Sequence, residues 1–249
     1  MKLTVPKIKA KKGLSHYVYV LLNLVLPILV FIFIRIDFAR LAVAIILLSK
    51  WRMFAVRPRY WFANIRANAV DIIVALSIVV FMQASHSQSW QLIWMALYGG
   101  WLIWIKPLSK IGAVSIQALI AQTVGISALV LFTKESSLLW LVLGAWAIGY
   151  ATVRHFLTAY DEPHVRTVGL TWGYITASLA WVLGHWQLYY VGIPQLTVVV
   201  SVISYAAAAM YYLTHVEKLS VGLKRNFVLL TSALLVIILL LSDWQYKGL

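Results

Sequence analysis

The sequence contains no cysteine, which removes disulfide bonds, thiol redox chemistry and thiolate metal sites from the functions to consider. Quinone-linked disulfide oxidoreductases are excluded for the same reason. Charge is also scarce, because only 11% of the 249 residues are charged, against about a quarter in soluble domains. Asp and Glu together number only 7. A water-soluble fold is therefore a poor starting hypothesis.

Several motifs of membrane enzymes and pumps are missing as well. No lysine falls in the interior of an apolar run, so a retinal Schiff base has no partner. No aspartate-rich pair of the kind used by prenyl or phosphoalcohol transferases is present, and no glycine-rich phosphate loop indicates an ATPase. The segment Lys50 to Pro58 is similar to the K-x6-R-P element of type 2 phosphatidic acid phosphatases. The acid and nucleophile elements of that family have no counterpart, so we treat the match as coincidence.

What the sequence does contain is a succession of long apolar runs, and 63% of its residues are hydrophobic. A helix needs about 20 apolar residues to cross a bilayer, where its backbone must satisfy its own hydrogen bonds. The runs predict an all-α, polytopic transmembrane helical bundle of about nine helices in a single integral membrane domain, residues 1–249. A basic tail, 1–13, precedes the bundle, 14–249. The predicted spans are 17–34, 38–56, 68–85, 90–105, 111–133, 137–155, 167–186, 193–214 and 226–243.

The net charge of +14 follows this alternation of spans and loops. Most of the 21 Lys and Arg residues lie in the tail and in the loops 50–66, 106–110, 154–166 and 218–225. The positive-inside rule therefore predicts a cytoplasmic N-terminus in a cell membrane, which we expect to be a bacterial inner membrane. Because topology explains the charge, we expect no nucleic acid partner. The expected partners are the bilayer, anionic headgroups at the cytoplasmic face and other membrane proteins.

Two predicted spans, 167–186 and 193–214, carry polar side chains along one helical face. As neighbours in sequence they are expected to pack together, so that their stripes face one another and form a substrate path. The residues of this predicted path are Thr171, Tyr174, Ser178, His185, Ser201, Tyr205 and Tyr212. The alternative is helix packing, since Gly169 and Gly173 form a GxxxG pair and hydroxyl groups often bond between membrane helices.

Three further places carry candidate functional groups. Asp71 lies near the start of an apolar run, where it is a candidate for ion coupling or for pairing with a basic residue. A possible cytoplasmic site consists of His155, Asp161, Glu162 and His164, whose alternative role is a solvated turn. A set of cations among aromatic residues is expected to bind anionic headgroups. It comprises Lys50, Arg52, Arg57 and Arg59.

These observations predict a transporter or permease-like protein that passes a small solute or lipid through the bundle. The alternatives are an intramembrane enzyme that acts on a lipid or isoprenoid phosphate, and a non-catalytic anchor or assembly subunit. Whether the chain is an enzyme is left open. We expect no cofactor and no metal.

Overall fold

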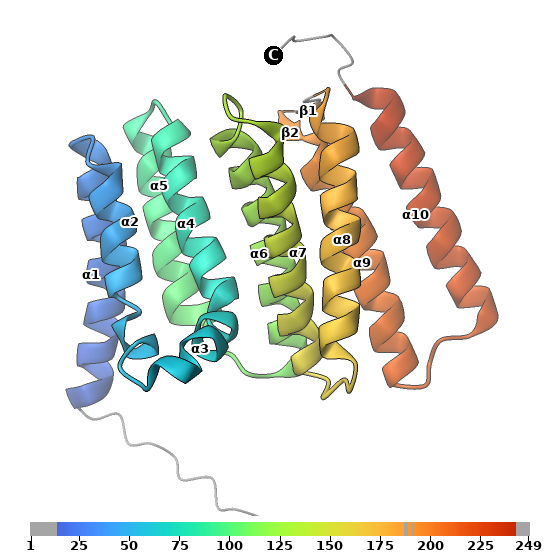
Figure 1. Cartoon of the computed structure of the whole chain (residues 1–249), viewed down its shortest axis with the longest axis horizontal. Coiled ribbons are helices and arrows are strands. Elements are labelled where there is room, and N and C mark those ends of the chain that lie inside the picture. The colour runs from blue at the N-terminus through green and yellow to red at the C-terminus, as the bar shows by residue number, and fades with distance from the viewer. Residues whose placement is uncertain (1–13, 187–188, 191, 243–249) are drawn as a thin grey trace, which may run out of the picture.

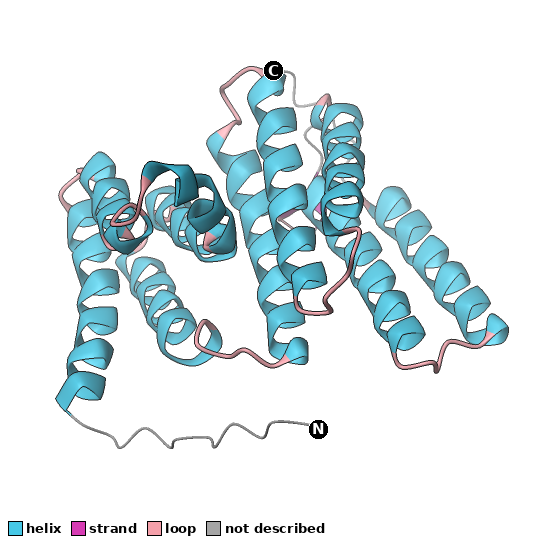
Figure 2. Ribbon diagram, turned by 60° about the horizontal axis from the view of Figure 1, so that its bottom comes forward, coloured by secondary structure: helices cyan, strands magenta, loops and turns pink. Residues whose placement is uncertain are grey.

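The computed structural model describes residues 14–186, 189–190 and 192–242, and almost all of this chain is helix joined by short loops (Figure 2). Two very short strands, β1 (Tyr189–Tyr190) and β2 (Ile193–Pro194), pair antiparallel. The helices are α1 (Leu14–Arg35), α2 (Ala39–Leu48), α3 (Trp61–Ala67), α4 (Ala69–Ala84), α5 (Gln88–Gly100), α6 (Ile111–Phe132), α7 (Leu138–Thr158), α8 (Val165–Gly184), α9 (Gln195–His215) and α10 (Val221–Leu241). The all-helical bundle is therefore confirmed.

The long helices stand side by side in a row that runs from α1 at one edge to α10 at the other (Figure 1). One buried apolar cluster joins α1, α2, α4 and α5, with Met82 and Tyr98 among its fully buried side chains. A second cluster joins α6 to α9 around Ile126 and Ala145. The two clusters meet where α4 packs closely on α6. A Cβ added to Gly125 of α6 would lie only 2.7 Å from Ile73 Cγ2 of α4.

Three helices are long and apolar enough to cross a membrane: α6, α9 and α10. The pair α3 and α4, with its leading turn, passes the same test together, although the two parts are bent by 65° at Asn68. By length and composition, three or four of the described helices qualify as spans, not nine. Helices α7 and α8 are long enough to span, but their Trp, Tyr and Gly residues lower their hydropathy.

The segment after α2 differs from the expected helix 38–56. Helix α2 ends at Leu48, and short helical turns η1 (Trp51–Met53) and η2 (Pro58–Tyr60) follow. Side chains hold these turns in place of a continuous helix, because the Trp61 indole donates to the Val56 carbonyl at 2.9 Å and Asn64 donates to the Met53 carbonyl at 3.1 Å. The consequence is that Lys50 turns inward at the end of α2.

The span expected at 90–105 also differs in detail. Helix α5 ends at Gly100, and a π-helical segment, η3 (Trp101–Ile105), continues it to Lys106. Such wider turns are rare and are frequently found at functional sites. Here the segment begins at Trp101 and is followed by Lys106, and both side chains contact the same carboxylate.

Helices α7 and α8 approach closely at glycines. A Cβ on Gly149 would lie 2.5 Å from Thr176 Oγ1, and one on Gly173 would lie 3.0 Å from the Trp146 carbonyl oxygen. Both glycines are buried. Small residues permit such close contact between helices that exclude water.

We expect Gly149→Val to lower the free energy of unfolding by about 1–3 kcal/mol, because the added methyl groups overlap Thr176 and force α7 and α8 apart. Unfolding followed in detergent micelles measures this effect. Gly222→Val is the matched control, since a Cβ there meets nothing within 4 Å. Equal losses in the two variants would contradict the close approach.

Candidate functional site: a lysine and aspartate cluster beside a cavity

The most deeply buried carboxylate of the described chain belongs to Asp71, in the first turn of α4. A negative charge is favourable at a helix N-terminus, where the backbone N–H groups point outward. Asp71 Oδ1 accepts a hydrogen bond from the Trp101 indole N–H at 3.0 Å. Its Oδ2 is paired with the ammonium groups of Lys50 and Lys106, the latter at 2.7 Å. Both carboxylate oxygens are thus satisfied.

The two lysines come from different basic loops and differ in exposure. The side chain of Lys50 is 6% exposed and that of Lys106 is 31% exposed. Burial lowers the pKa of Lys50, and the Asp71 carboxylate opposes this shift. With both lysines protonated, two ammonium groups face one carboxylate, so the cluster has an excess of positive charge.

A cavity of about 830 Å³ adjoins this cluster. Its apolar wall comes from α1 and α2, with Leu26, Leu29 and Ile45 among the lining residues. Its polar residues are Asn23, Ser49, Lys50, Asn64, Asn68 and Lys106. Ligand cavities are usually mostly apolar with a few polar groups that fix orientation, as here. The arrangement suits a molecule with a hydrocarbon part and an anionic end.

The chain was also compared with known proteins. No family model, curated protein or solved structure matches it.

The residues expected to bind headgroups do not act as one group. Lys50 is buried in the cluster, whereas Arg57 and Arg59 are exposed on the loop before α3. The Arg59 guanidinium lies 4.7 Å from the centre of the Tyr60 ring. The side chain of Arg52 lies outside the described residues.

The residues expected to form a substrate path are spread over the outer surface and the interior. Thr171 and Tyr174 are exposed on α8, Ser178 is half-buried on the same helix, and His185 is exposed directly after its last residue. On α9, Tyr205 and Tyr212 are exposed. Ser201 shares a 2.8 Å hydrogen bond with Thr123 of α6. Among the described residues, no hydrogen bond connects the α8 set with the α9 set.

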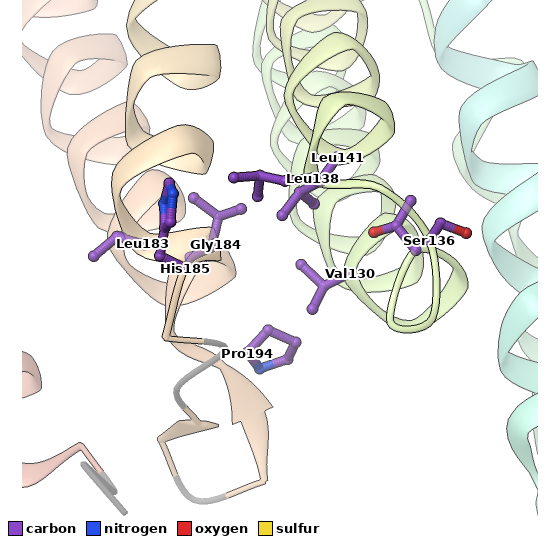
Figure 3. Close-up of a pocket in the computed structure, with 10 residues that line it drawn as sticks. Val130, Ser136, Leu138, Leu141, Leu183, Gly184, His185 and Pro194 are labelled. Carbon is purple, nitrogen blue, oxygen red and sulfur yellow. The ribbon is translucent and has the colours of Figure 1, made fainter. Parts of the chain in front are cut away.

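One predicted residue, His185, lines a small cavity at the end of the bundle near β2 (Figure 3). The cavity measures about 50 Å³ and lies between the α6–α7 turn, the end of α8 and Pro194. Leu138, Leu141 and Leu183 are among its lining residues (Figure 3). This volume suits a few water molecules rather than a solute. His185 Nδ1 lies 2.6 Å from the Trp181 carbonyl oxygen, within its own helix.

The possible cytoplasmic site is also dispersed. His155 Nε2 lies 3.0 Å from Gln117 Oε1, while Asp161 is exposed in a turn with φ of 54°. Glu162 accepts a 2.5 Å hydrogen bond from the Tyr211 hydroxyl and a 3.4 Å bond from the backbone N–H of His164. Within the described ranges, no group of three His, Asp or Glu residues is placed to hold a metal ion.

The hydrogen bond from Tyr211 holds the pKa of Glu162 below its ordinary range, and the bond from His164 adds to this effect. A lowered pKa in the folded state stabilises the protein above the ordinary glutamate pKa of about 4.3, and this contribution is lost as the pH falls through the lowered value. We therefore expect the wild type to lose stability below about pH 4.3 more steeply than Glu162→Gln. Unfolding at a series of pH values measures this, with Tyr211→Phe expected to behave like Glu162→Gln. Parallel pH profiles for all three proteins would contradict it.

Lys106 and Trp101 belong to the cluster but were not among the sequence candidates. A weak signal for Lys106 exists, because it ends an apolar run in a basic loop on the same side as Lys50. The indole of Trp101 gives no such signal, since tryptophan at the end of a span is typical of interfacial belts.

Proposed function

We propose that this chain is a multi-pass membrane protein of about nine crossings, with a cytoplasmic N-terminus, that binds an amphipathic anion and passes it through the bundle. The observation that carries the proposal is the 830 Å³ cavity, with an apolar wall along α1 and α2 and the Lys50–Asp71–Lys106 cluster at its polar side. The ligand class is a hydrocarbon chain with a phosphate or carboxylate end.

The arrangement of the loops supports the nine crossings. The α2–α3, η3–α6, α7–α8 and α9–α10 connections, which contain the four basic loops, lie at one end of the row, opposite β1 and β2 (Figure 1). Long helices that alternate in direction bring every basic loop to the same side. The positive-inside rule assigns that side to the cytoplasm.

The absence of cysteine allows this topology to be tested with single introduced thiols. We expect Ser87→Cys and Ser136→Cys, in exposed loops opposite the basic end, to react with a membrane-impermeant maleimide in intact cells. Ser109→Cys, in an exposed basic loop, is expected to react only after the cells are opened. Labelling of Ser109→Cys in intact cells, or protection of both other thiols, would overturn the topology.

The residues of the cavity favour binding and passage over catalysis. No histidine and no carboxylate is among the described residues that line it. Asp71 lies behind the lysines, and both of its oxygens are engaged. A hydrolase or transferase needs a positioned acid, base or metal, which the lining residues do not supply.

Binding can be tested with phosphatidic acid as the probe, on the whole protein in phosphatidylcholine vesicles. Lys106→Met removes one cation from the cavity and keeps the buried Lys50–Asp71 pair. A cation near a membrane surface contributes about 1 kcal/mol, so we expect roughly fivefold weaker binding. Lys110→Met is the matched control, because Lys110 is exposed in the same loop and does not line the cavity. Equal affinities for the two variants would overturn the site.

Passage is tested separately in vesicles that carry a fluorescent phosphatidic acid on one leaflet. We expect the wild type to speed its exchange between leaflets, and Lys106→Met to slow this more than Lys110→Met. Binding that depends on Lys106 without any exchange would contradict passage and favour a subunit that only holds the lipid.

A further inference from the structure

A second cavity lies between α6, α7, α8 and α9, away from the lysine cluster. Its inner part measures about 170 Å³ and an adjoining outer part about 270 Å³. Ser115, Leu119, Phe156 and Ala208 line both parts, so the two are adjacent. The lining residues come from the first half of α6, the last turns of α7, the first turns of α8 and the second half of α9, which places the cavity in the half of the bundle near the basic loops.

The cavity has uncharged walls, in contrast to the first one. No lysine and no arginine is among the described residues of either part. Alanines such as Ala118, Ala207 and Ala208 leave the space open, and Tyr160, Tyr205 and Tyr212 surround the outer part. Tyr211, which lines the inner part, is hydrogen-bonded to the carboxylate of Glu162, and this negative charge disfavours an anion.

The inner part contains polar groups. Gln122 of α6 donates to Ser204 of α9 and accepts from Thr152 of α7 at 3.1 Å, which ties the three helices together at this depth. Trp172 of α8 also lines the inner part, and its buried indole nitrogen has no hydrogen-bond partner among the described residues. An unpaired buried donor is costly, so an acceptor oxygen that reaches this nitrogen from the cavity would stabilise the protein.

From these observations we infer that the cavity binds one neutral lipid, whose hydrocarbon chain fills the apolar part and whose ester carbonyl accepts a hydrogen bond from Trp172. The absence of lining cations, the carboxylate of Glu162 and the unpaired donor select an uncharged acceptor over a phosphate. This site is independent of the anion site proposed above, because the two cavities share no lining residue.

A photoreactive diacylglycerol in phosphatidylcholine vesicles is the probe, used on the full-length protein. Trp172→Phe removes the donor and keeps an aromatic ring in place, so we expect about three- to tenfold weaker labelling. Ala208→Ile places a larger side chain where both parts of the cavity meet, and it is expected to lower labelling further. Trp181→Phe is the matched control, because Trp181 lies on the same helix with its side chain exposed.

Three results would overturn the inference. The first is labelling that is equal in the wild type, Trp172→Phe and Ala208→Ile. The second is a Trp172→Phe variant that is more stable than the wild type in the presence of diacylglycerol, since this would show that the donor stays unpaired. The third is competition by phosphatidic acid as strong as that by unlabelled diacylglycerol. Because Lys106→Met is expected to leave this labelling unchanged, failure here is distinguishable from failure of the anion site.

Discussion

Asp71→Asn is expected to lower the free energy of unfolding by about 3–5 kcal/mol, the largest effect of any single substitution proposed for this protein. The reason is that Lys50 is almost fully buried and Asp71 is its carboxylate partner. Removing one member of a buried pair leaves the other charge without compensation in a poorly solvated place. The asparagine keeps the size of the side chain and the bond from Trp101, so the change isolates the charge. Unfolding in detergent micelles measures it.

A double variant tests whether the cost of Asp71→Asn comes from the unpaired charge of Lys50. The double variant Lys50→Met, Asp71→Leu removes both buried charges, and apolar replacements of a buried pair are often neutral or stabilising. We expect it to be more stable than Asp71→Asn alone. Lys106→Met is the matched single change, with a small cost because the Lys106 side chain is 31% exposed. If Asp71→Asn and Lys106→Met lower the free energy of unfolding by the same amount, Asp71 is not the centre of the cluster.

The helical bundle could be predicted from sequence because apolar runs broken by basic or polar turns report helices directly. The ends of α6 and α4 fall within a residue or two of the predicted spans. The segment after α2 could not be predicted, because its course depends on Trp61 and Asn64 bonding back to loop carbonyls. Such tertiary hydrogen bonds leave no periodic signal in the sequence.

The candidate site was only partly visible in the sequence. Asp71 stands out as a carboxylate in an apolar run, and Lys50 as a cation at the end of another. The packing of α2, α4 and η3 brings Lys50 and Lys106 to the same carboxylate, and the sequence does not show this packing. Helical spacing placed Tyr174 and Tyr205 on polar faces, yet spacing alone does not show whether a face points toward a neighbour or outward. In the structure both tyrosines are more than half exposed.

Gln117 is the residue by which α6 holds the end of the preceding helix near the cluster. Its side chain is buried on α6, and its Nε2 donates to the carbonyl oxygens of Ile105 at 2.7 Å and Leu108 at 2.9 Å. These carbonyls flank Lys106, at a helix end where carbonyl groups lack partners within the helix. The Oε1 of Gln117 meets His155 of α7. One amide therefore joins the end of η3, α6 and α7.

We expect Gln117→Leu to lower the free energy of unfolding by about 1–3 kcal/mol, because the carbonyls of Ile105 and Leu108 and the His155 imidazole lose a shared hydrogen-bond partner together. The same variant is expected to weaken phosphatidic acid binding, since Lys106 loses the support of the residues on either side. His155→Leu is the matched control, which removes the imidazole and leaves the bonds to Ile105 and Leu108. It should reduce stability and leave binding close to that of the wild type. If His155→Leu weakens binding as much as Gln117→Leu, the amide does not act by positioning Lys106.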